Sequence, residues 1–361
     1  MKLHPSLESI GQKVGKGERL SHEDGLSLFR SPDLLSIGAL ANIVRERKNG
    51  NRAYFINNRH INPTNICKNR CKFCAFSKTS GEEGAYTMGL EEILKAASDY
   101  NNGNVSEFHI VGGLHPDLPF RFYEDMLKAL KRRFPAVHIQ AFTAVEIAYL
   151  AEISHLGLGK TLGRLREAGL GSMPGGGAEI FSPSTRKKIC PEKITGDEWL
   201  QIMETAHGLG IRTNATMLYG HLESMEDCVD HLLRLRELQD KTGGFLAFIP
   251  LAFHPKNTDL ETVRSTTGQL DLRVLSISRL MLDNFDHIKA YWIMMGPKIS
   301  QLSLLFGADD MDGTVVEEKI THAAGAETEE FTAKQTLMDL IRETGREPYE
   351  RDTLYQKMVK V

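Results

Sequence analysis

Residues 62–76 read NPTNICKNRCKFCAF and place three of the chain's five cysteines, Cys67, Cys71 and Cys74, in one short stretch. Clustered thiolates suit zinc or an iron–sulfur cluster. A structural zinc site normally has four ligands, but this stretch has neither a second CxxC pair nor a nearby histidine at zinc-finger spacing. A cubane cluster held by three cysteines would keep one iron free for a ligand. The distant Cys190 and Cys228 are interpreted as small buried hydrophobic residues.

On both sides of this stretch, strand-like runs alternate with amphipathic helical runs. The pattern predicts an α/β fold with a parallel sheet, in the form of a TIM-like (βα) barrel. An open doubly wound sheet is the structural alternative. We expect a helical extension over 1–50 and a barrel with a C-terminal closing segment over 51–361. Strands are expected at 54–61, 107–113, 137–142, 212–220, 245–251 and 287–296, and helices at 90–100, 122–134, 196–210 and 225–240.

The overall composition limits the possible partners and surroundings of the chain. It has 361 residues, 25% of them charged, and a net charge of -3, and its basic runs are short, so we do not expect it to bind nucleic acid. No stretch resembles a secretion signal or a membrane span, which predicts a cytoplasmic protein without membrane association. In a reducing compartment, clustered cysteines favour metal or redox chemistry over disulfides.

Other polar and glycine-rich positions follow predicted strands, where the catalytic loops of a barrel lie. Gly112 and Gly113 end one strand, where the lack of a Cβ allows close approach of a ligand or a tight turn. Thr143 follows the next strand and could contact a ligand or cap a helix. Glu179 lies just beyond the three glycines of MPGGGAEI, where its carboxylate could accept hydrogen bonds from two hydroxyls.

The spacing CxxxC-x-aromatic-C, with Phe73 as the aromatic residue, resembles the signature of radical S-adenosylmethionine (SAM) enzymes. The resemblance implies that Cys67, Cys71 and Cys74 hold a 4Fe–4S cluster whose free iron chelates SAM. It also implies that Gly112 and Gly113 bind the SAM amino group, that Glu179 binds the ribose, and that the cluster loop with Phe73 and the hydroxyl of Thr143 lies beside SAM.

A narrower resemblance covers residues from about 54 to 355. The segments RHINPTNIC, GGGAEIFSPSTRKKICPEK, NATMLYGH and GADDMDGTVVEEKITHAAGA are similar to the menaquinone branch, specifically the aminofutalosine synthase family. This implies that SAM is a co-substrate whose 5'-deoxyadenosyl radical adds to 3-(1-carboxyvinyloxy)benzoate to give 6-amino-6-deoxyfutalosine. It also implies an electron donor such as flavodoxin or ferredoxin.

Two alternatives stay open at this point. The dehypoxanthine futalosine cyclases share much of the pattern but abstract hydrogen. An iron–sulfur electron-transfer protein or a zinc-binding protein could use the same cysteines without being an enzyme.

The implied substrate carries two carboxylates, so its cavity needs cations or aligned hydrogen-bond donors. His115, His221 and His254 follow strand ends and are catalytic candidates, and Arg186 and His254 are candidates for substrate binding. The acidic run at Asp309, Asp310 and Asp312 lacks calcium-loop spacing and predicts a turn.

Overall fold

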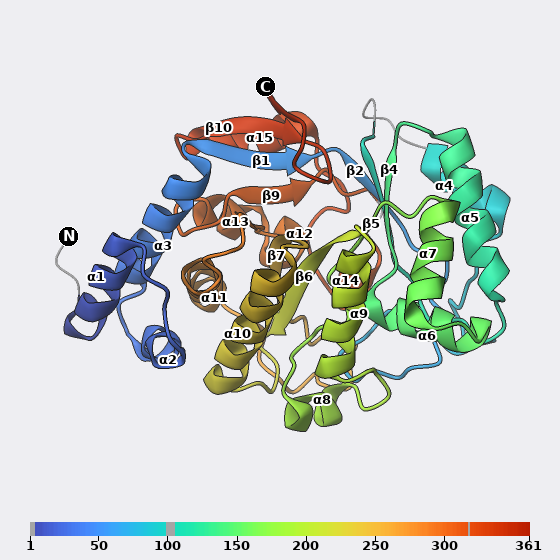
Figure 1. The fold of residues 1–361 in the computed structure, drawn as a ribbon, viewed down its shortest axis with the longest axis horizontal. Helices are drawn as coiled ribbons and strands as arrows, with labels where there is room; N and C mark the ends of the chain where they lie inside the picture. Colours follow the sequence, from blue (N-terminus) through green and yellow to red (C-terminus); the bar gives the residue numbers. More distant parts are fainter. Residues whose placement is uncertain (1–3, 99–104, 317) are drawn as a thin grey trace.

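The computed structural model describes residues 4–98, 105–316 and 318–361, and its centre is a curled parallel sheet (Figure 1). Its seven strands follow the order β2-β3-β4-β5-β6-β7-β8, and each neighbouring pair is parallel. The strands are β2 (Asn58–Ile61), β3 (Glu107–Ile110), β4 (His138–Ala141), β5 (Ser172–Met173), β6 (Arg212–Tyr219), β7 (Phe245–Ala252) and β8 (His287–Ile288). The predicted βα barrel is confirmed, in a partly closed form.

Helices connect successive strands of this sheet and cover its outer face. They are α4 (Leu90–Ser98), α5 (Phe120–Arg133), α6 (Ala144–Ser154), α7 (Leu158–Ala168), α8 (Pro183–Ile189), α9 (Gly196–Gly208), α10 (Met225–Thr242) and α11 (Gly268–Met281). The helix predicted over 90–100 is α4, and its last two predicted residues, Asp99 and Tyr100, lie outside the described residues. Parallel strands need such crossovers, which place all carboxyl ends of the strands at one edge.

A smaller sheet lies beside the open side of the barrel. Its order is β11-β10-β1-β9, with β1 (Arg52–Ile56), β9 (Asp310–Gly313), β10 (Glu347–Arg351) and β11 (Met358–Lys360). A bridge between Lys289 and Asp310 joins β9 to the chain just after β8. The strand predicted at 54–61 is therefore two strands in two sheets, because β1 pairs with β9 and β10 while β2 pairs with β3.

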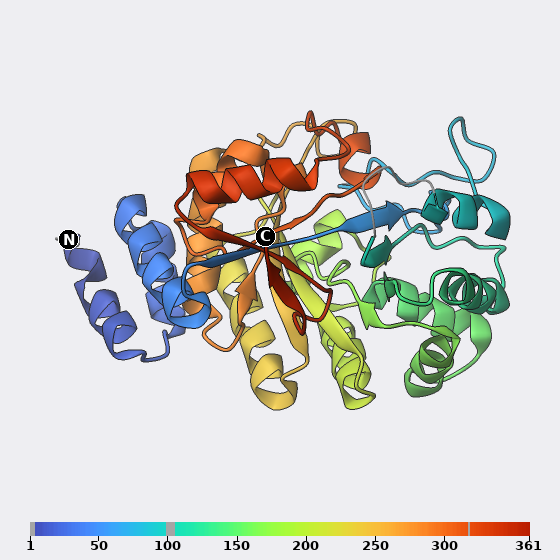
Figure 2. The same ribbon diagram turned by 90° about the horizontal axis from the view of Figure 1, so that it is seen from above.

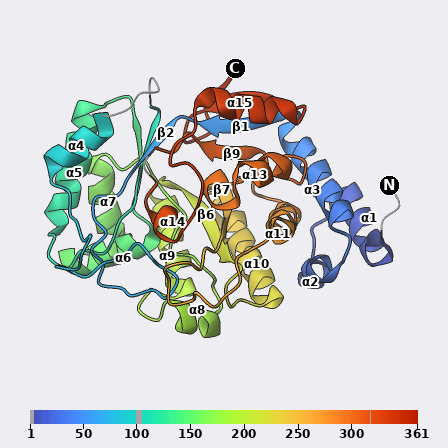
Figure 3. The ribbon, with the colours of Figure 1, turned by 180° about the vertical axis from the view of Figure 1, so that it is seen from behind.

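The apolar run at 287–296 was predicted as one strand, and this is wrong beyond Ile288. Its second half forms α12 (Trp292–Met295), because short buried apolar runs do not distinguish helix from strand. The C-terminal part adds α13 (Pro297–Ser303), α14 (Ile320–Ala323) and α15 (Lys334–Glu343). Figure 3 shows α14 in front of the large sheet.

The N-terminal segment forms a helical layer, as its pattern predicted. It contains η1 (Pro5–Leu7), α1 (Glu8–Lys16), α2 (His22–Arg30) and α3 (Leu34–Asn49). In Figure 2 this layer occupies one end of the long axis, opposite the end that carries α4 and α5. Arg273 of α11 donates hydrogen bonds to the carbonyls of Leu28 and Ser31. Leu7 and Ile37 belong to the same buried cluster as the barrel core, so the boundary near residue 50 stays a prediction.

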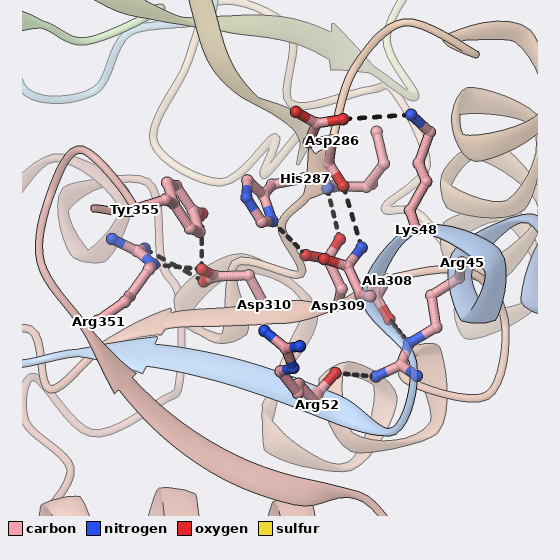
Figure 4. A network of polar contacts seen from close by, with 12 residues as sticks. Arg45, Lys48, Arg52, Asp286, His287, Ala308, Asp309, Asp310, Arg351 and Tyr355 are labelled. Atoms are coloured by element: carbon pink, nitrogen blue, oxygen red, sulfur yellow. Dashed lines mark hydrogen bonds and ion pairs between the residues drawn. The ribbon is translucent and has the colours of Figure 1, made fainter. Parts of the chain in front are cut away.

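The acidic run at 309–312 belongs to strand β9 and the residue before it, so the predicted turn is wrong. Asp309 lies between Arg279 and His287, whose Nδ1 is 2.6 Å from its Oδ2. Asp310 pairs with Arg351 and accepts a hydrogen bond of 2.6 Å from the Tyr355 hydroxyl (Figure 4). Buried carboxylates are stable only when they are paired, and these residues therefore close the barrel instead of binding a cation.

No helix among the described residues is long and apolar enough to cross a membrane.

Candidate functional site

A cavity of about 320 Å³ extends from the loops at the carboxyl ends of the strands to side chains within the strands of the curled sheet. Ten of the residues singled out from the sequence line it: Cys67, Cys71, Phe73, Cys74, Gly112, Gly113, Thr143, Glu179, His254 and Asp312. All but Asp312, which lies on β9, come from different βα loops, which the parallel topology brings to one edge. Their individual roles stay predictions.

The three cysteines lie in the loop between β2 and α4, at the mouth of the cavity. Backbone hydrogen bonds fix this loop: the Cys67 amide donates to the Lys78 carbonyl at 3.0 Å and the Cys74 amide to the Cys71 carbonyl at 3.0 Å. Cys67 and Cys74 are half-buried and Cys71 is buried. The loop is therefore held rigidly before any ligand arrives.

The donor set fits an iron–sulfur cluster better than a single metal ion. In the part of the chain that the structure describes, no three His, Cys, Asp or Glu side chains converge on one ion. A cluster does not require such convergence, because each sulfur binds a different iron. Burial raises the pKa of the Cys71 thiol to about 12, while Lys193 opposes this shift.

Gly112 and Gly113 bring the end of β3 against the cysteine loop. A Cβ on Gly113 would lie 2.2 Å from the Ile66 carbonyl oxygen, and one on Gly112 would lie 3.1 Å from the Thr64 carbonyl oxygen. The Gly113 amide also donates to the Thr64 carbonyl at 2.9 Å. Close packing against the cysteine loop is therefore a further reason for glycine at these two positions, which the sequence argument did not include.

Thr143 lines the cavity and also caps α6. Its hydroxyl accepts a hydrogen bond from the Glu146 amide at 3.3 Å, and its own amide donates to the Glu146 carboxylate at 2.7 Å, which is a capping box. The same carboxylate accepts from the Gly112 amide at 3.1 Å. Burial raises the pKa of Glu146 to about 7, against the effect of these hydrogen bonds. Glu146 thus links β3 to α6, a connection that sequence reasoning missed.

Glu179 shares the mouth of the cavity with a buried cation, Lys193. The Glu179 backbone has a φ of 46°, a left-handed conformation that is unusual for a residue other than glycine. The Lys193 ammonium is 2.5 Å from the Glu179 carboxylate and 4.9 Å from the centre of the Phe73 ring. Burial would lower the pKa of Lys193, but the charges of Cys71 and Glu179 outweigh it and raise the pKa. Lys193 stays charged, so the mouth holds a buried ion pair whose ammonium group also faces the Phe73 ring.

Three residues that the sequence suggested for the site lie outside the cavity. Arg186 is buried and donates to the carbonyls of Ala178, Ile180 and Ile194, so its guanidinium braces the segment that carries Glu179. His115 Nδ1 accepts a hydrogen bond from the amide two residues later. His221 hydrogen-bonds the carbonyl of Leu218 at 3.1 Å. Each of these side chains is engaged in local structure.

His254 lines the cavity and has a defined tautomer. Its Nε2 is 2.9 Å from the carbonyl oxygen of Met294. Because a carbonyl can only accept, Nε2 carries the proton and Nδ1 is the acceptor of the neutral ring.

The floor of the cavity, formed by residues within β2, β3 and β4, is polar. His60 and His109 stack with ring centres 4.5 Å apart, and His109 Nδ1 is 3.1 Å from the Gln140 side-chain oxygen. Burial, followed by the neighbouring His109, lowers the pKa of His60 to about 4. Lys289 is also on the floor, where it pairs with Asp312 at 3.1 Å.

Sequence reasoning missed this polar floor, although three of the polar side chains that form it lie within predicted strands. His60, His109 and Gln140 are register partners on three neighbouring strands and all line the cavity. The Oδ1 atom of Asn214 on β6, another lining residue, has no hydrogen-bond partner among the described residues. A buried acceptor without a partner is costly, so Asn214 is a candidate contact for a bound ligand or an ordered water.

Comparison with known proteins gives the family. Residues 61–235 match the model of the radical SAM superfamily, and residues 242–360 match the CofH/MqnC C-terminal region. The chain is 47% identical over 358 residues to an aminodeoxyfutalosine synthase of Thermus thermophilus, covering 98% of this chain and 96% of that protein. It is 45% identical to an aminodeoxyfutalosine synthase of Streptomyces coelicolor, covering 96% and 92%.

The fold has a solved counterpart in methylornithine synthase (PylB), with a TM-score of 0.74 and 20% identity over 94% of this chain and 97% of that one. Membership in the superfamily implies a 4Fe–4S cluster and SAM as the cofactors, which the three thiols at the mouth fit. The chain therefore belongs to the radical SAM superfamily of enzymes, in the group that includes the aminodeoxyfutalosine synthases.

Proposed function

We propose that this enzyme adds the 5'-deoxyadenosyl group of SAM to the alkene carbon of 3-(1-carboxyvinyloxy)benzoate, with migration of the aryl group and loss of one carboxylate as carbon dioxide (bicarbonate). The products are 6-amino-6-deoxyfutalosine, for menaquinone biosynthesis, and methionine. The observation that carries the proposal is one cavity with a lysine at each of two separate places, Lys193 beside Glu179 and Lys289 beside Asp312. Three cysteines and Lys193 stand at its mouth, and Lys289 stands on its floor. The 47% identity to a named aminodeoxyfutalosine synthase supports the same activity.

At the mouth, Cys67, Cys71 and Cys74 would hold the cluster, which together with SAM supplies the 5'-deoxyadenosyl radical when bound. The carbonyls of the glycine pair at the end of β3 would accept from the SAM amino group. Glu179 would accept hydrogen bonds from the ribose hydroxyls. Lys193, which already contacts Glu179 and Phe73, would neutralise the SAM carboxylate.

On the floor, Lys289 would bind one carboxylate of the substrate. It is one of only two Lys or Arg side chains among the described residues that line the cavity, and the other, Lys193, lies at the cofactor end. Lys289 is 4% exposed, so a carboxylate there meets a charge with little competition from water. His254 would accept a proton or hydrogen bond at Nδ1, because its Nε2 is already bound.

The wall of the cavity formed by β6 and β7 is partly apolar. Leu218, Ile249, Leu251 and Phe253 line the cavity from β6, β7 and the residue after β7. These walls exclude water and leave few ways for two bound molecules to pack. Addition to an alkene requires the reacting carbons near van der Waals contact, since a misplaced radical would abstract hydrogen instead.

The test is anaerobic incubation of the reconstituted enzyme with dithionite, SAM and 3-(1-carboxyvinyloxy)benzoate, followed by mass spectrometry. We expect methionine and an adenosylated product in equal amounts. Free 5'-deoxyadenosine, formed only with a futalosine-type substrate, would instead identify a hydrogen-abstracting cyclase. Cys67→Ala, Cys71→Ala or Cys74→Ala should each abolish turnover, and retained turnover would refute the cluster assignment.

A further inference from the structure

A second cavity, of about 470 Å³, opens beside α8 on the outside of the barrel. Lys193 lines both this outer groove and the cavity at the cysteine loop, and Cys190 lines the groove beside it. The Lys72 amide, between two of the cluster cysteines, donates to the carbonyl of Ile189 at the end of α8 at 2.8 Å. The groove therefore lies directly behind the cysteine loop, with one layer of side chains between them.

Three exposed lysines lie at or next to this groove: Lys187 lines it, Lys188 follows on α8, and Lys72 lies in the cysteine loop that is bonded to the end of α8. Lys187 and Lys188 of α8 and Lys72 of the cysteine loop are exposed, and among the described residues none of them forms an ion pair. Other cations nearby are already neutralised: Arg234 pairs with Asp197 and Lys68 pairs with Glu152. We call Lys72, Lys187 and Lys188 the α8 lysine surface.

The position of α8 favours access by a large partner. Helix α8 projects at the lower edge of the molecule in both Figure 1 and Figure 3, away from the small C-terminal sheet. Two exposed carboxylates in the described part of the chain lie close to these three lysines without an ion pair to any of them: Glu192, between Cys190 and Lys193, and Asp259, whose amide donates to the Lys72 carbonyl at 2.8 Å. A third, Asp197, lines the groove and is paired with Arg234. Unpaired like charges on one face attract an oppositely charged protein and raise its rate of association.

We propose that the α8 lysine surface is the docking site of an acidic one-electron carrier protein that reduces the cluster. This inference rests on the proposed function, because a radical SAM enzyme of this kind needs an external electron. The carrier is oxidised by one electron and the cluster is reduced by the same electron. No atom is transferred. The groove would bring the carrier's redox centre to the single side-chain layer behind the cysteine loop.

The experiment compares Lys187→Glu/Lys188→Glu with the matched control Lys128→Glu/Lys160→Glu. The control lysines are also exposed and without an ion pair among the described residues, but they lie on α5 and α7. The probe is a purified acidic flavodoxin. Its affinity is measured by anaerobic titration calorimetry with reconstituted, cluster-containing enzyme and oxidised flavodoxin, and its rate of cluster reduction is followed by visible absorbance with reduced flavodoxin.

We expect the α8 variant to lose about tenfold or more in affinity and in reduction rate at low salt, since steering by charge contributes factors of this size. Rates with dithionite, a small reductant, should be unchanged, and the control variant should behave as the wild type. Equal losses in both variants, or no loss in the α8 variant, would overturn the docking site. If Lys187→Glu/Lys188→Glu folds poorly, Lys187→Gln/Lys188→Gln should show a smaller loss in the same direction.

These readouts separate two failures. If the enzyme makes no adenosylated product with dithionite, the proposed function is wrong, whatever the flavodoxin data show. If product forms with dithionite but flavodoxin binds the α8 variant as it binds the wild type, only the docking site is wrong.

Discussion

Replacing Lys289 by methionine tests the division of the cavity into a cofactor end and a substrate end. Lys289 is 4% exposed, and its only ion-pair partner among the described residues is Asp312 at 3.1 Å. Hydrogen bonds to charged groups contribute about 1.5–3 kcal/mol. Losing one to a substrate carboxylate should weaken substrate binding by about 10- to 150-fold, at about 1.4 kcal/mol per factor of ten.

The same change also affects folding, so the assay must separate the two effects. Removing one partner of a buried pair costs about 3–5 kcal/mol when the other charge is left uncompensated. That figure is an upper limit here, because Arg351 lies 3.9 Å from Asp312. Lys289→Met/Asp312→Asn removes both charges and should recover stability without recovering substrate affinity.

The assay is equilibrium dialysis of reconstituted enzyme, under anaerobic conditions, with the enol-ether benzoate and with SAM separately. We expect Lys289→Met to bind the benzoate at least tenfold more weakly and SAM with unchanged affinity. If benzoate binding is unchanged, or if SAM binding falls to the same extent, Lys289 does not define a substrate end and the reasoning fails.

Three further predictions follow from the site. Gly113→Ala should lower the iron content of reconstituted enzyme, because its Cβ would lie 2.2 Å from a carbonyl oxygen of the cysteine loop; iron analysis with full occupancy would contradict this. Lys193→Met should weaken SAM binding about tenfold or more while benzoate binding holds, the reverse of the Lys289 result, since it removes the cation at the cofactor end. His322 hydrogen-bonds Glu318 on the segment that carries α14, and this bond raises its pKa from 6.5 to about 9. A raised histidine pKa stabilises the folded state fully below about pH 6.5, and the contribution is lost as the pH rises toward 9. The difference in melting temperature between wild type and His322→Gln should therefore shrink over that range; a difference that grows with pH would show the opposite linkage.

Local pattern was enough to predict the barrel, because hydrophobic periodicity reports which face of each element is buried. The helices at α5, α9 and α10 and the strands at β6 and β7 agree with their predicted spans to within a few residues. The incorrect predictions concern runs of sequence that were expected to form one strand but form two different elements. The run at 54–61 divides between two sheets, and the apolar run after Ile288 turns into a helix.

The candidate site likewise has features that the sequence predicts and features that it does not. The cysteine spacing, Phe73, the glycine pair and Glu179 are local in sequence, and all of them line the cavity. The partner of each charged side chain, in contrast, is not set by residues near it in the sequence. Arg186 was a substrate candidate, but its guanidinium is taken up by backbone carbonyls.

The sequence by itself determined the cysteine loop and the alternation of strands and helices, because both depend on residues that are neighbours along the chain. Only the tertiary structure decided that Lys193 stands at the mouth and Lys289 on the floor, and that His60 stacks on His109. The physical reason is that a buried charge or ring must find a partner. Which partner it finds depends on segments that folding brings together from distant parts of the chain.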